Sequence, residues 1–288
     1  MAEIGLIDVD GHNYPNVALM KLSAWHKRNG DTVEWVVPRH YDRIYKSKVF
    51  SWTDDRGTRL AEATEVIQGG TGYGFDTLPP HVDQACPDYS IYPEHKEAYG
   101  FLTRGCPRSC SWCIVPQKEG QGGKYMDIEE FWDGRKATVL MDNNVLAYEW
   151  GLEQIEKIIR LGIRVDFNQG LDAGLITEEI AKLLGRVEWY KPLRMACDTM
   201  AQMKHIKRAT ELLRTHGAKP QRYFVYVLTK DVPDAMQRVL FLRSLNLDPF
   251  AQPYRDATGR VNYEVRRFAR WVNHKATLKT VRWEEYKG

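Results

Sequence analysis

The hydrophobic and polar positions of this chain follow two periods, which predict short strands alternating with helices. Apolar residues recur at helical spacing over residues 152–159 and 203–213, and Gly162 and Gly217 follow as stop signals. Pro233 opens a further helix. Short apolar runs separate the helices and predict strands at residues 99–103, 137–141, 163–167, 193–197 and 223–228. Strands and helices in this alternation predict parallel βαβ units, an α/β fold.

The first 80 residues predict a smaller module of their own. A strand over residues 4–9, a helix over 17–28 and a strand over 33–37 form a βαβ opening, and another strand is expected near Val66. We therefore expect a truncated Rossmann-like module at 1–80, a linker at 81–98, a main domain at 99–254 and a C-terminal extension at 255–288.

Three of the five cysteines, Cys106, Cys110 and Cys113, lie within one short segment. Ligands at this spacing can bind three corners of an iron–sulfur cube and leave the fourth iron open. Structural zinc requires a second ligand pair, and no further Cys-x-x-Cys or His-x-x-x-His motif occurs in the chain. A disulfide is not expected in a chain without a secretory signal pattern. The spacing therefore favours an iron–sulfur cluster.

The segment from Thr103 to Pro116 resembles the cluster loop of radical S-adenosylmethionine (SAM) enzymes, with an aromatic residue, Trp112, before the third cysteine. The resemblance is strongest to the cobalamin-domain and methylthiotransferase-like branches. It implies a [4Fe–4S] cluster on the three cysteines, whose open iron binds the amino and carboxylate groups of SAM. Reduction would then split SAM into methionine and a 5′-deoxyadenosyl radical. The resemblance also implies a partial (β/α)6 barrel after the N-terminal module.

Active sites of parallel barrels lie at the carboxyl ends of the strands, so the polar residues there are candidate SAM ligands. Asp142 stands where relatives carry a Gly-Gly-Glu-like motif for the SAM amino group, although this chain departs from that motif. Asp198 could accept a hydrogen bond from a ribose hydroxyl. Trp112, Asn143 and Gln169 complete the expected cofactor-binding set. The alternative for each polar residue is a helix cap or a polar turn.

The sequence of the N-terminal module resembles an incomplete version of the cobalamin-binding pattern. His12 stands in an Asp-x-His context, but Pro15 replaces the glycine of that pattern and the module is short, so cobalamin is not expected and His12 is interpreted as a turn residue. A glycine run at 69–74 precedes Pro79 and Pro80 rather than a helix, which argues against dinucleotide binding. We expect this run to let the backbone approach the barrel mouth. Cys197, outside the cluster motif, is expected to pack in the core.

The C-terminal extension is basic and rich in aromatic residues. From Arg255 onward nine basic residues stand against four acidic ones, in a chain of net charge +3. This mixture suits phosphate contact and base stacking, but the favoured interpretation is a closing helix whose aromatic residues pack on the body.

Three hypotheses follow from the resemblance, which extends to segments such as Tyr92-Pro93 and 271–273 and is closest to stand-alone, often phage-encoded members. The first is hydrogen abstraction leading to rearrangement of an amino-acid-modified thymidine in DNA. The second is methyl or methylthio transfer, and the third is a non-catalytic iron–sulfur nucleic-acid-binding protein. A radical enzyme would need a low-potential electron donor of the flavodoxin or ferredoxin type. No apolar run approaches the ~20 residues of a membrane span, so we expect a cytoplasmic protein without a membrane partner.

Overall fold

The structure, a computed structural model, describes residues 1–58, 61–218, 223–256 and 259–288. The chain divides into two compact units. The N-terminal unit comprises Met1–Gly100 and Met126–Thr138, and the C-terminal unit comprises Phe101–Tyr125 and Val139–Gly288. The segment expected as a linker, 81–98, thus lies within the N-terminal unit, and the expected extension, 255–288, lies within the C-terminal unit.

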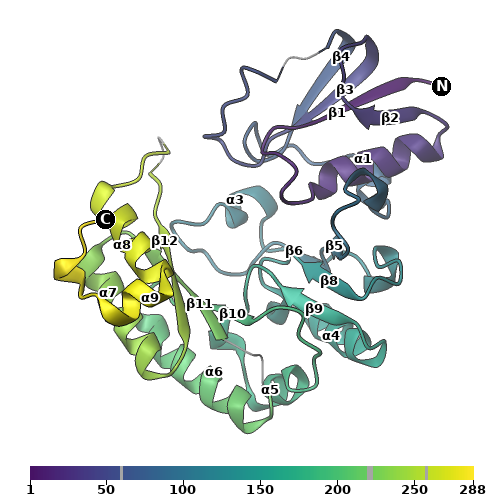
Figure 1. Ribbon diagram of the computed structural model, residues 1–288. Coiled ribbons are helices and arrows are strands. Elements are labelled where there is room, and N and C mark those ends of the chain that lie inside the picture. The colour runs from purple at the N-terminus through teal and green to yellow at the C-terminus, as the bar shows by residue number, and fades with distance from the viewer. Residues whose placement is uncertain (59–60, 219–222, 257–258) are drawn as a thin grey trace. The chain divides into compact units, whose positions relative to one another are not determined.

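The N-terminal unit is built on a parallel four-stranded sheet with the order β2-β1-β3-β4 (Figure 1). Helix α1 begins after Asn16, whose side chain accepts a hydrogen bond from the backbone N–H of Leu19 at 3.3 Å. The bounds are β1 Glu3–Asp8, α1 Val17–Arg28, β2 Thr32–Trp35, β3 Tyr41–Ser47, β4 Ala63–Gly69 and α2 Pro80–Asp83. The predicted strands at 4–9 and 33–37 and the helix at 17–28 are confirmed to within two residues.

The C-terminal unit contains most of the remaining elements (Figure 1). The bounds after α2 are β5 Ala98–Gly100, β6 Thr103–Arg104, α3 Val115–Glu119, β7 Gly123–Lys124, β8 Ala137–Leu140, α4 Glu149–Arg160, β9 Arg164–Phe167, α5 Glu178–Leu184, β10 Leu193–Ala196, α6 Met203–Thr215, β11 Tyr223–Thr229, α7 Val232–Ser244, β12 Asp248–Pro253, α8 Tyr263–Asn273 and α9 Lys275–Thr280. The predicted helices at 152–159 and 203–213 are confirmed, and the apolar run at 99–103 is divided between β5 and β6.

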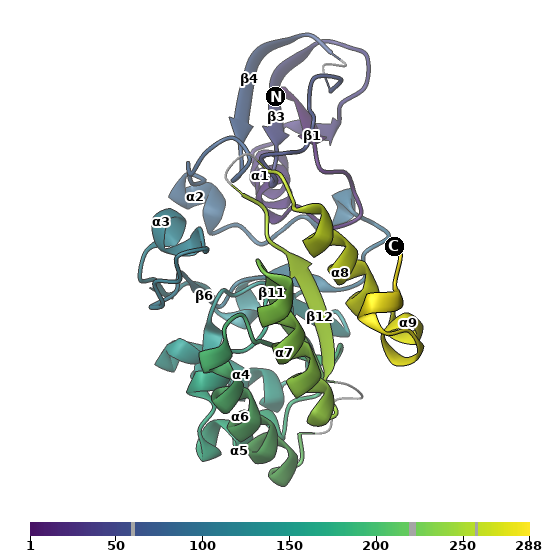
Figure 2. The ribbon, with the colours of Figure 1, turned by 90° about the vertical axis from the view of Figure 1, so that its left-hand side faces the viewer.

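The sheet β10-β11-β12 has two unlike faces. One face is buried, with Met195 on β10 and Val225 on β11, and helices α7 and α8 pack against β11 and β12 (Figure 2). The opposite face is only half-buried and carries Arg194, Phe224, Tyr226 and Phe250. Parallel sheets are normally covered on both faces. The half-buried face is therefore a surface that a ligand could contact.

The prediction of a partial (β/α)6 barrel is wrong. The strands form separate small sheets, β5-β8-β9 and β10-β11-β12, instead of one six-stranded sheet. Among the residues that the structure describes, isolated bridges alone pair the regions of β9 and β10, namely Val165 with Trp189 and Leu171 with Met195. The backbone of Val165 bonds to Glu188 and Tyr190 in the loop before β10, so this loop takes the place beside β9 that a continuous sheet would give to β10. The structure is a mixed α/β protein with several small parallel sheets.

Three strands were not predicted, namely β3, the two-residue β7, and β12. Strand β3 carries charged residues such as Asp42 and Lys46, which interrupt its apolar run. Strand β12 contains Pro249 and Pro253, which usually argue against a strand. Because β12 lies at the edge of its sheet, its prolines are tolerated. Asn273 of α8 then pairs with both backbone groups of Ala251, at 2.8 and 3.0 Å.

Candidate functional site

The cysteine segment is a loop closed at its base by two glycines. Thr103 and Arg104 of β6 pair antiparallel with Lys124 and Gly123 of β7. The Cys106 N–H donates to the Gly120 carbonyl at 3.2 Å. Gly105 and Gly122 have φ angles of +74° and +73°, and a Cβ on Gly122 would lie 1.7 Å from the Arg104 carbonyl oxygen. Only glycine permits this approach, so the local sequence fixes where the loop begins and ends.

Glu119, at the end of α3, ties the loop together. Its carboxylate accepts hydrogen bonds from the Arg104 guanidinium, the Gly105 N–H and the Asn143 side chain, each at 2.9 Å. Glu119 was not predicted as a site residue, because a glutamate in a short helix has no distinctive spacing. Its three partners converge from the start of the loop and from the segment after β8.

The loop crosses the carboxyl ends of successive strands in order. Near the first cysteine, the Asn144 side chain, after β8, donates to Cys106 Sγ at 3.6 Å. Arg108 next donates through Nε to Asp172, after β9, at 2.8 Å. Cys110 then lies within electrostatic range of Asp198, after β10.

Trp112 completes the series at the last two strands. The Lys230 ammonium, after β11, lies 4.8 Å from the Trp112 ring centroid and 4.7 Å from that of Tyr254, after β12. One loop therefore gathers side chains from the ends of β8, β9, β10, β11 and β12. This convergence is the main geometric feature of the C-terminal unit.

The three thiols are free and near the surface: Cys106 and Cys110 are half-buried, and Cys113 is exposed. Burial, followed by the negative charges of Cys113, Cys106 and Asp198, raises the pKa of the Cys110 thiol. Across the described residues, no group of three or more His, Cys, Asp or Glu side chains is close enough to count as a formed metal site. The cysteines nevertheless share one loop, and Cys106 Sγ accepts from both Asn144 and the Arg108 N–H, the latter at 3.5 Å.

Asp142 and Asn143 hold the loop in place. Asp142 is buried, and its carboxylate accepts from the backbone N–H groups of Leu102 and Thr103 and from the Thr103 hydroxyl, at 2.5 to 3.2 Å. Burial raises its pKa to about 6, while these hydrogen bonds act in the opposite direction. Asn143 donates to Glu119. The observed contacts of both residues thus lie within the protein.

Gln169 and Asp198 differ in their surroundings. Gln169 is exposed, and no hydrogen bond of its side chain is found within the described ranges. Asp198 accepts from the Leu228 N–H at 2.8 Å, and burial raises the pKa of its carboxyl. The buried Arg238 donates to the carbonyls of Cys197 and Leu228, at 2.8 and 3.1 Å, and so fixes both strands that hold Asp198.

Two further residues belong to this site although sequence analysis did not select them. Asn144 and Asp172 lie in the polar segments after β8 and β9, and Asn144 Nδ2 donates to Asp172 at 3.2 Å. Asn144 is 4% exposed, and its Oδ1 has no hydrogen-bond partner among the described residues. The sequence marked both segments as polar, but only the structure shows which side chains turn toward the cysteines.

Cys197 packs in the core, as predicted. Its side chain is buried, and burial raises the pKa of the thiol to about 12.

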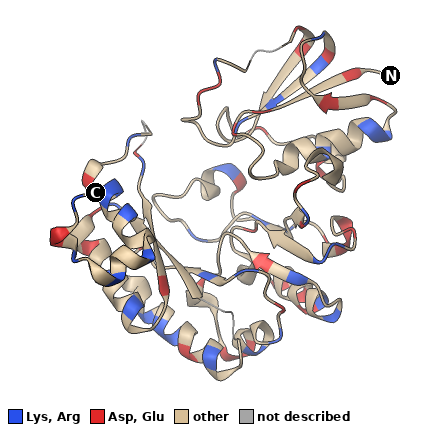
Figure 3. Ribbon diagram, viewed as in Figure 1, with Lys and Arg blue, Asp and Glu red and all other residues tan. Residues whose placement is uncertain are grey.

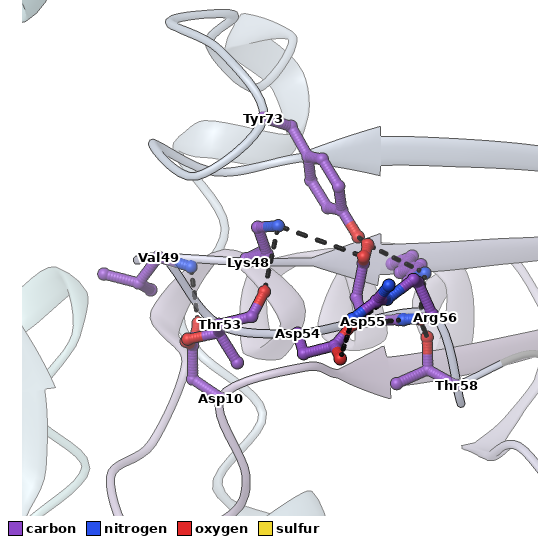
Figure 4. A network of polar contacts seen from close by, with 10 residues as sticks. Asp10, Lys48, Val49, Thr53, Asp54, Asp55, Arg56, Thr58 and Tyr73 are labelled. Carbon is purple, nitrogen blue, oxygen red and sulfur yellow. Dashed lines mark hydrogen bonds and ion pairs between the residues drawn. The ribbon is translucent and has the colours of Figure 1, made fainter. Parts of the chain in front are cut away.

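The N-terminal unit has a polar network at the carboxyl edge of its sheet (Figure 4). Asp10 accepts from the Val49 N–H and the Thr53 hydroxyl, both at 2.5 Å. Lys48 donates to the Thr53 carbonyl at 3.2 Å, and the Tyr73 hydroxyl donates to Asp55. Each of these charged groups thus has a hydrogen-bond partner in the loop after β3 or in Tyr73, and the contacts hold that loop.

The glycine run and His12 also have structural roles in this unit. A Cβ on Gly70 would lie 2.4 Å from the Lys48 carbonyl oxygen, so the run allows a close approach to the Lys48 backbone. The His12 ring packs 4.2 Å from the Trp35 ring, centroid to centroid. An open cavity of about 460 Å³ in the same unit is lined by residues such as Cys86, His95 and Arg135, and by none of the predicted site residues.

The aromatic residues of the C-terminal segment are partly packed. Phe268 and Trp271 are buried, and Arg267 stacks on the Trp283 ring at 4.3 Å. This packing agrees with the favoured interpretation of a closing helix. Within the described chain, no helix is both long and apolar enough to cross a membrane.

Comparison with known proteins gives one distant similarity. Over 133 residues the chain is 28% identical to bacteriochlorophyllide d C-12(1)-methyltransferase from Chlorobaculum tepidum, and the alignment covers 40% of this chain and 29% of that protein. No protein-family model matches the chain. The similar protein is an enzyme, in agreement with the prediction that this chain is one.

Proposed function

We propose that Cys106, Cys110 and Cys113 bind a [4Fe–4S] cluster and that the protein is a radical SAM enzyme. The observation that carries this proposal is the course of the cysteine loop across the carboxyl ends of β8 to β12. Ligand and catalytic residues of parallel α/β proteins gather at this end of the strands. A loop that only stabilised the fold would not need to bring three thiols to this position.

The donor chemistry fits an iron–sulfur cluster. Three cysteine thiols on one loop supply the sulfur ligands that iron–sulfur clusters take. Hydrogen bonds from Asn144 and from the Arg108 N–H reach Cys106 Sγ. Such donors to cysteine sulfur are among the features that set the reduction potential of iron–sulfur proteins.

When bound, the cluster would supply the electron that divides SAM into methionine and a 5′-deoxyadenosyl radical. The residues of the chain would orient the cofactor. We expect Asp198 to accept a hydrogen bond from a ribose hydroxyl and Trp112 to offer an aromatic surface beside the last cysteine. Asp142 contributes indirectly, because its hydrogen bonds fix Leu102 and Thr103 before the loop. The distant methyltransferase similarity also supports SAM as the cofactor.

For the substrate we propose a modified thymidine in DNA. Phe224, Tyr226 and Phe250 form a cluster on the half-buried sheet face, with Phe224 and Phe250 5.1 Å apart between ring centroids. Aromatic faces of this kind bind flat bases by stacking. A flavodoxin- or ferredoxin-type protein would deliver the electron.

The test is release of 5′-deoxyadenosine by anaerobically reconstituted protein with SAM and a reductant. The Cys110→Ala variant should release none, whereas Cys86→Ala, a matched change outside the loop, should behave like the wild type. Release that increases with DNA carrying amino-acid-modified thymidine would support the substrate. Equal release by Cys110→Ala and the wild type would refute the radical chemistry.

Methyl transfer is the second candidate function, because the similar protein is named as a methyltransferase. SAM labelled in its methyl group distinguishes the two reactions. Rearrangement leaves the label out of the substrate, whereas methylation places it there.

A further inference from the structure

The exposed face of α8 carries basic residues that take no part in the folding contacts of this helix. Val265, Phe268, Ala269 and Val272 are buried against the unit. Tyr263, Arg266 and Arg270 follow the opposite side at intervals of three and four residues, and all are exposed. We call these three residues the α8 stripe. Residues at such spacing lie next to one another on a helix surface.

The arginines of the α8 stripe are available for a partner. In the described part of the chain, neither Arg266 nor Arg270 forms an ion pair, and Tyr263 is 72% exposed. By contrast, Arg267 donates to the Tyr286 carbonyl and stacks on Trp283, so its charge is used within the protein. Glu264, the acid of this helix, lies about a quarter turn from the α8 stripe by helical geometry. The stripe itself therefore contains no acidic residue.

A second group of cations and rings lies at Tyr254, where the chain leaves β12. The connection from β12 to α8 starts at Tyr254, whose ring lies 4.7 Å from the Lys230 ammonium. Lys230 in turn lies over the Trp112 ring of the loop. Figure 3 shows Lys and Arg positions on α8 and α9, which follow that connection. Cations interleaved with exposed rings suit a phosphate backbone and its bases.

We infer that the α8 stripe binds the backbone of a single-stranded nucleic acid and leads that strand toward the candidate site. The inference rests on the proposed function for the destination of the strand, although binding itself requires no cluster. A lipid surface would need an apolar face for insertion, and the apolar face of α8 is buried in the protein. A single strand fits better than a duplex, because an enzyme that acts on a base must reach it outside the stack.

The test is fluorescence anisotropy of the full-length protein with labelled oligothymidylate over a range of salt concentrations. The double variant Arg266→Gln/Arg270→Gln should bind about tenfold more weakly or worse at 50 mM salt, because each phosphate contact contributes about 0.7 to the logarithmic salt slope. That slope should fall by about 1.4. Tyr263→Ala should weaken binding about fivefold without changing the slope.

A matched control removes the same charge elsewhere. Lys204→Gln/Lys207→Gln changes two exposed lysines of α6 and should leave the affinity and the slope unchanged. Equal weakening by both double variants would overturn the inference, as would binding that is insensitive to salt. Tighter binding of polyglutamate than of any oligonucleotide would also overturn it, in favour of an acidic protein partner. Comparison with oligouridylate then identifies DNA or RNA as the natural strand.

The two proposals fail separately. Loss of oligonucleotide binding in a protein that still cleaves SAM would refute the α8 stripe alone. Intact, salt-sensitive binding in a protein that never cleaves SAM would refute the proposed function alone.

Discussion

Some residues around the cysteine loop fix its backbone, and others contact the cysteine side chains. Asp142 was expected to contact a cofactor, yet its observed partners are Leu102 and Thr103. Asn144, its near neighbour, was not selected but reaches Cys106 Sγ. A sequence can mark a polar segment after a strand, but it does not determine which side chain turns inward. That choice depends on backbone angles and packing partners that are distant in sequence.

Asp142 should make stability depend on pH. Burial raises its pKa in the folded state to about 6, above its ordinary value of 3.8, so the folded protein binds the proton more tightly than the unfolded chain. This contribution is complete below about pH 4 and is lost as the pH rises through 6. The free energy of unfolding of the wild type, relative to Asp142→Asn, should therefore fall by about 2 kcal/mol between pH 4 and 7. Urea unfolding at several pH values measures it, and a pH-independent difference would contradict the assignment.

Replacement of Asn144 should alter the electronic properties of the cysteine site. Asn144→Leu removes the hydrogen bond to Cys106 Sγ, and the loss of a donor disfavours the more negative, reduced state. We expect the midpoint potential of the iron-loaded protein to fall by on the order of 50 mV, with iron content retained. Asn168→Leu, a change of the same type after β9, is the control. An unchanged potential in Asn144→Leu would mean that its side chain does not act on a bound cluster.

At the scale of elements, helices and strands with a regular hydrophobic pattern were predicted, and those without such a pattern were not. Helix α4 and strand β11 have clear periodicity, and both were predicted. Strand β12 was missed because its prolines resemble a loop, and only its edge position makes them acceptable. The antiparallel pair β6 and β7 is too short to leave a pattern, although it closes the cysteine loop.

The β6–β7 closure should be sensitive to a single methyl group. Gly122→Ala would place a Cβ 1.7 Å from the Arg104 carbonyl oxygen, whereas the matched Gly120→Ala, also at positive φ, meets no atom within 4 Å. Gly120→Ala carries backbone strain alone, on the order of 1–3 kcal/mol, because Gly120 has φ +66° and ψ −153°. Gly122→Ala should cost clearly more and reduce the iron bound per chain. Thermal unfolding and iron analysis of the two variants measure both effects, and equal behaviour would contradict the role of Gly122.

At the scale of the whole molecule, the α/β class was predictable but the arrangement of the sheets was not. Alternating strands and helices predict parallel units, and the structure has parallel sheets. The strands do not form a continuous barrel, because residues 188–190, rather than β10, pair with the backbone of β9. Strand order and closure depend on which edge each backbone group pairs with, and four-residue strands such as β9 and β10 carry little information about that choice. The strand ends are nevertheless brought to one loop, on which the proposed function depends.

The most direct measurement is the iron and acid-labile sulfide content of protein reconstituted under anaerobic conditions, for the wild type, Cys86→Ala and each of the three loop variants. A [4Fe–4S] cluster predicts about four irons and four sulfides per chain in the wild type and Cys86→Ala. Variants of Cys106, Cys110 or Cys113 should lose most of both. Iron and sulfide that remain unchanged in all three loop variants, or that never bind to the wild type, would contradict the assignment of this loop as a cluster site.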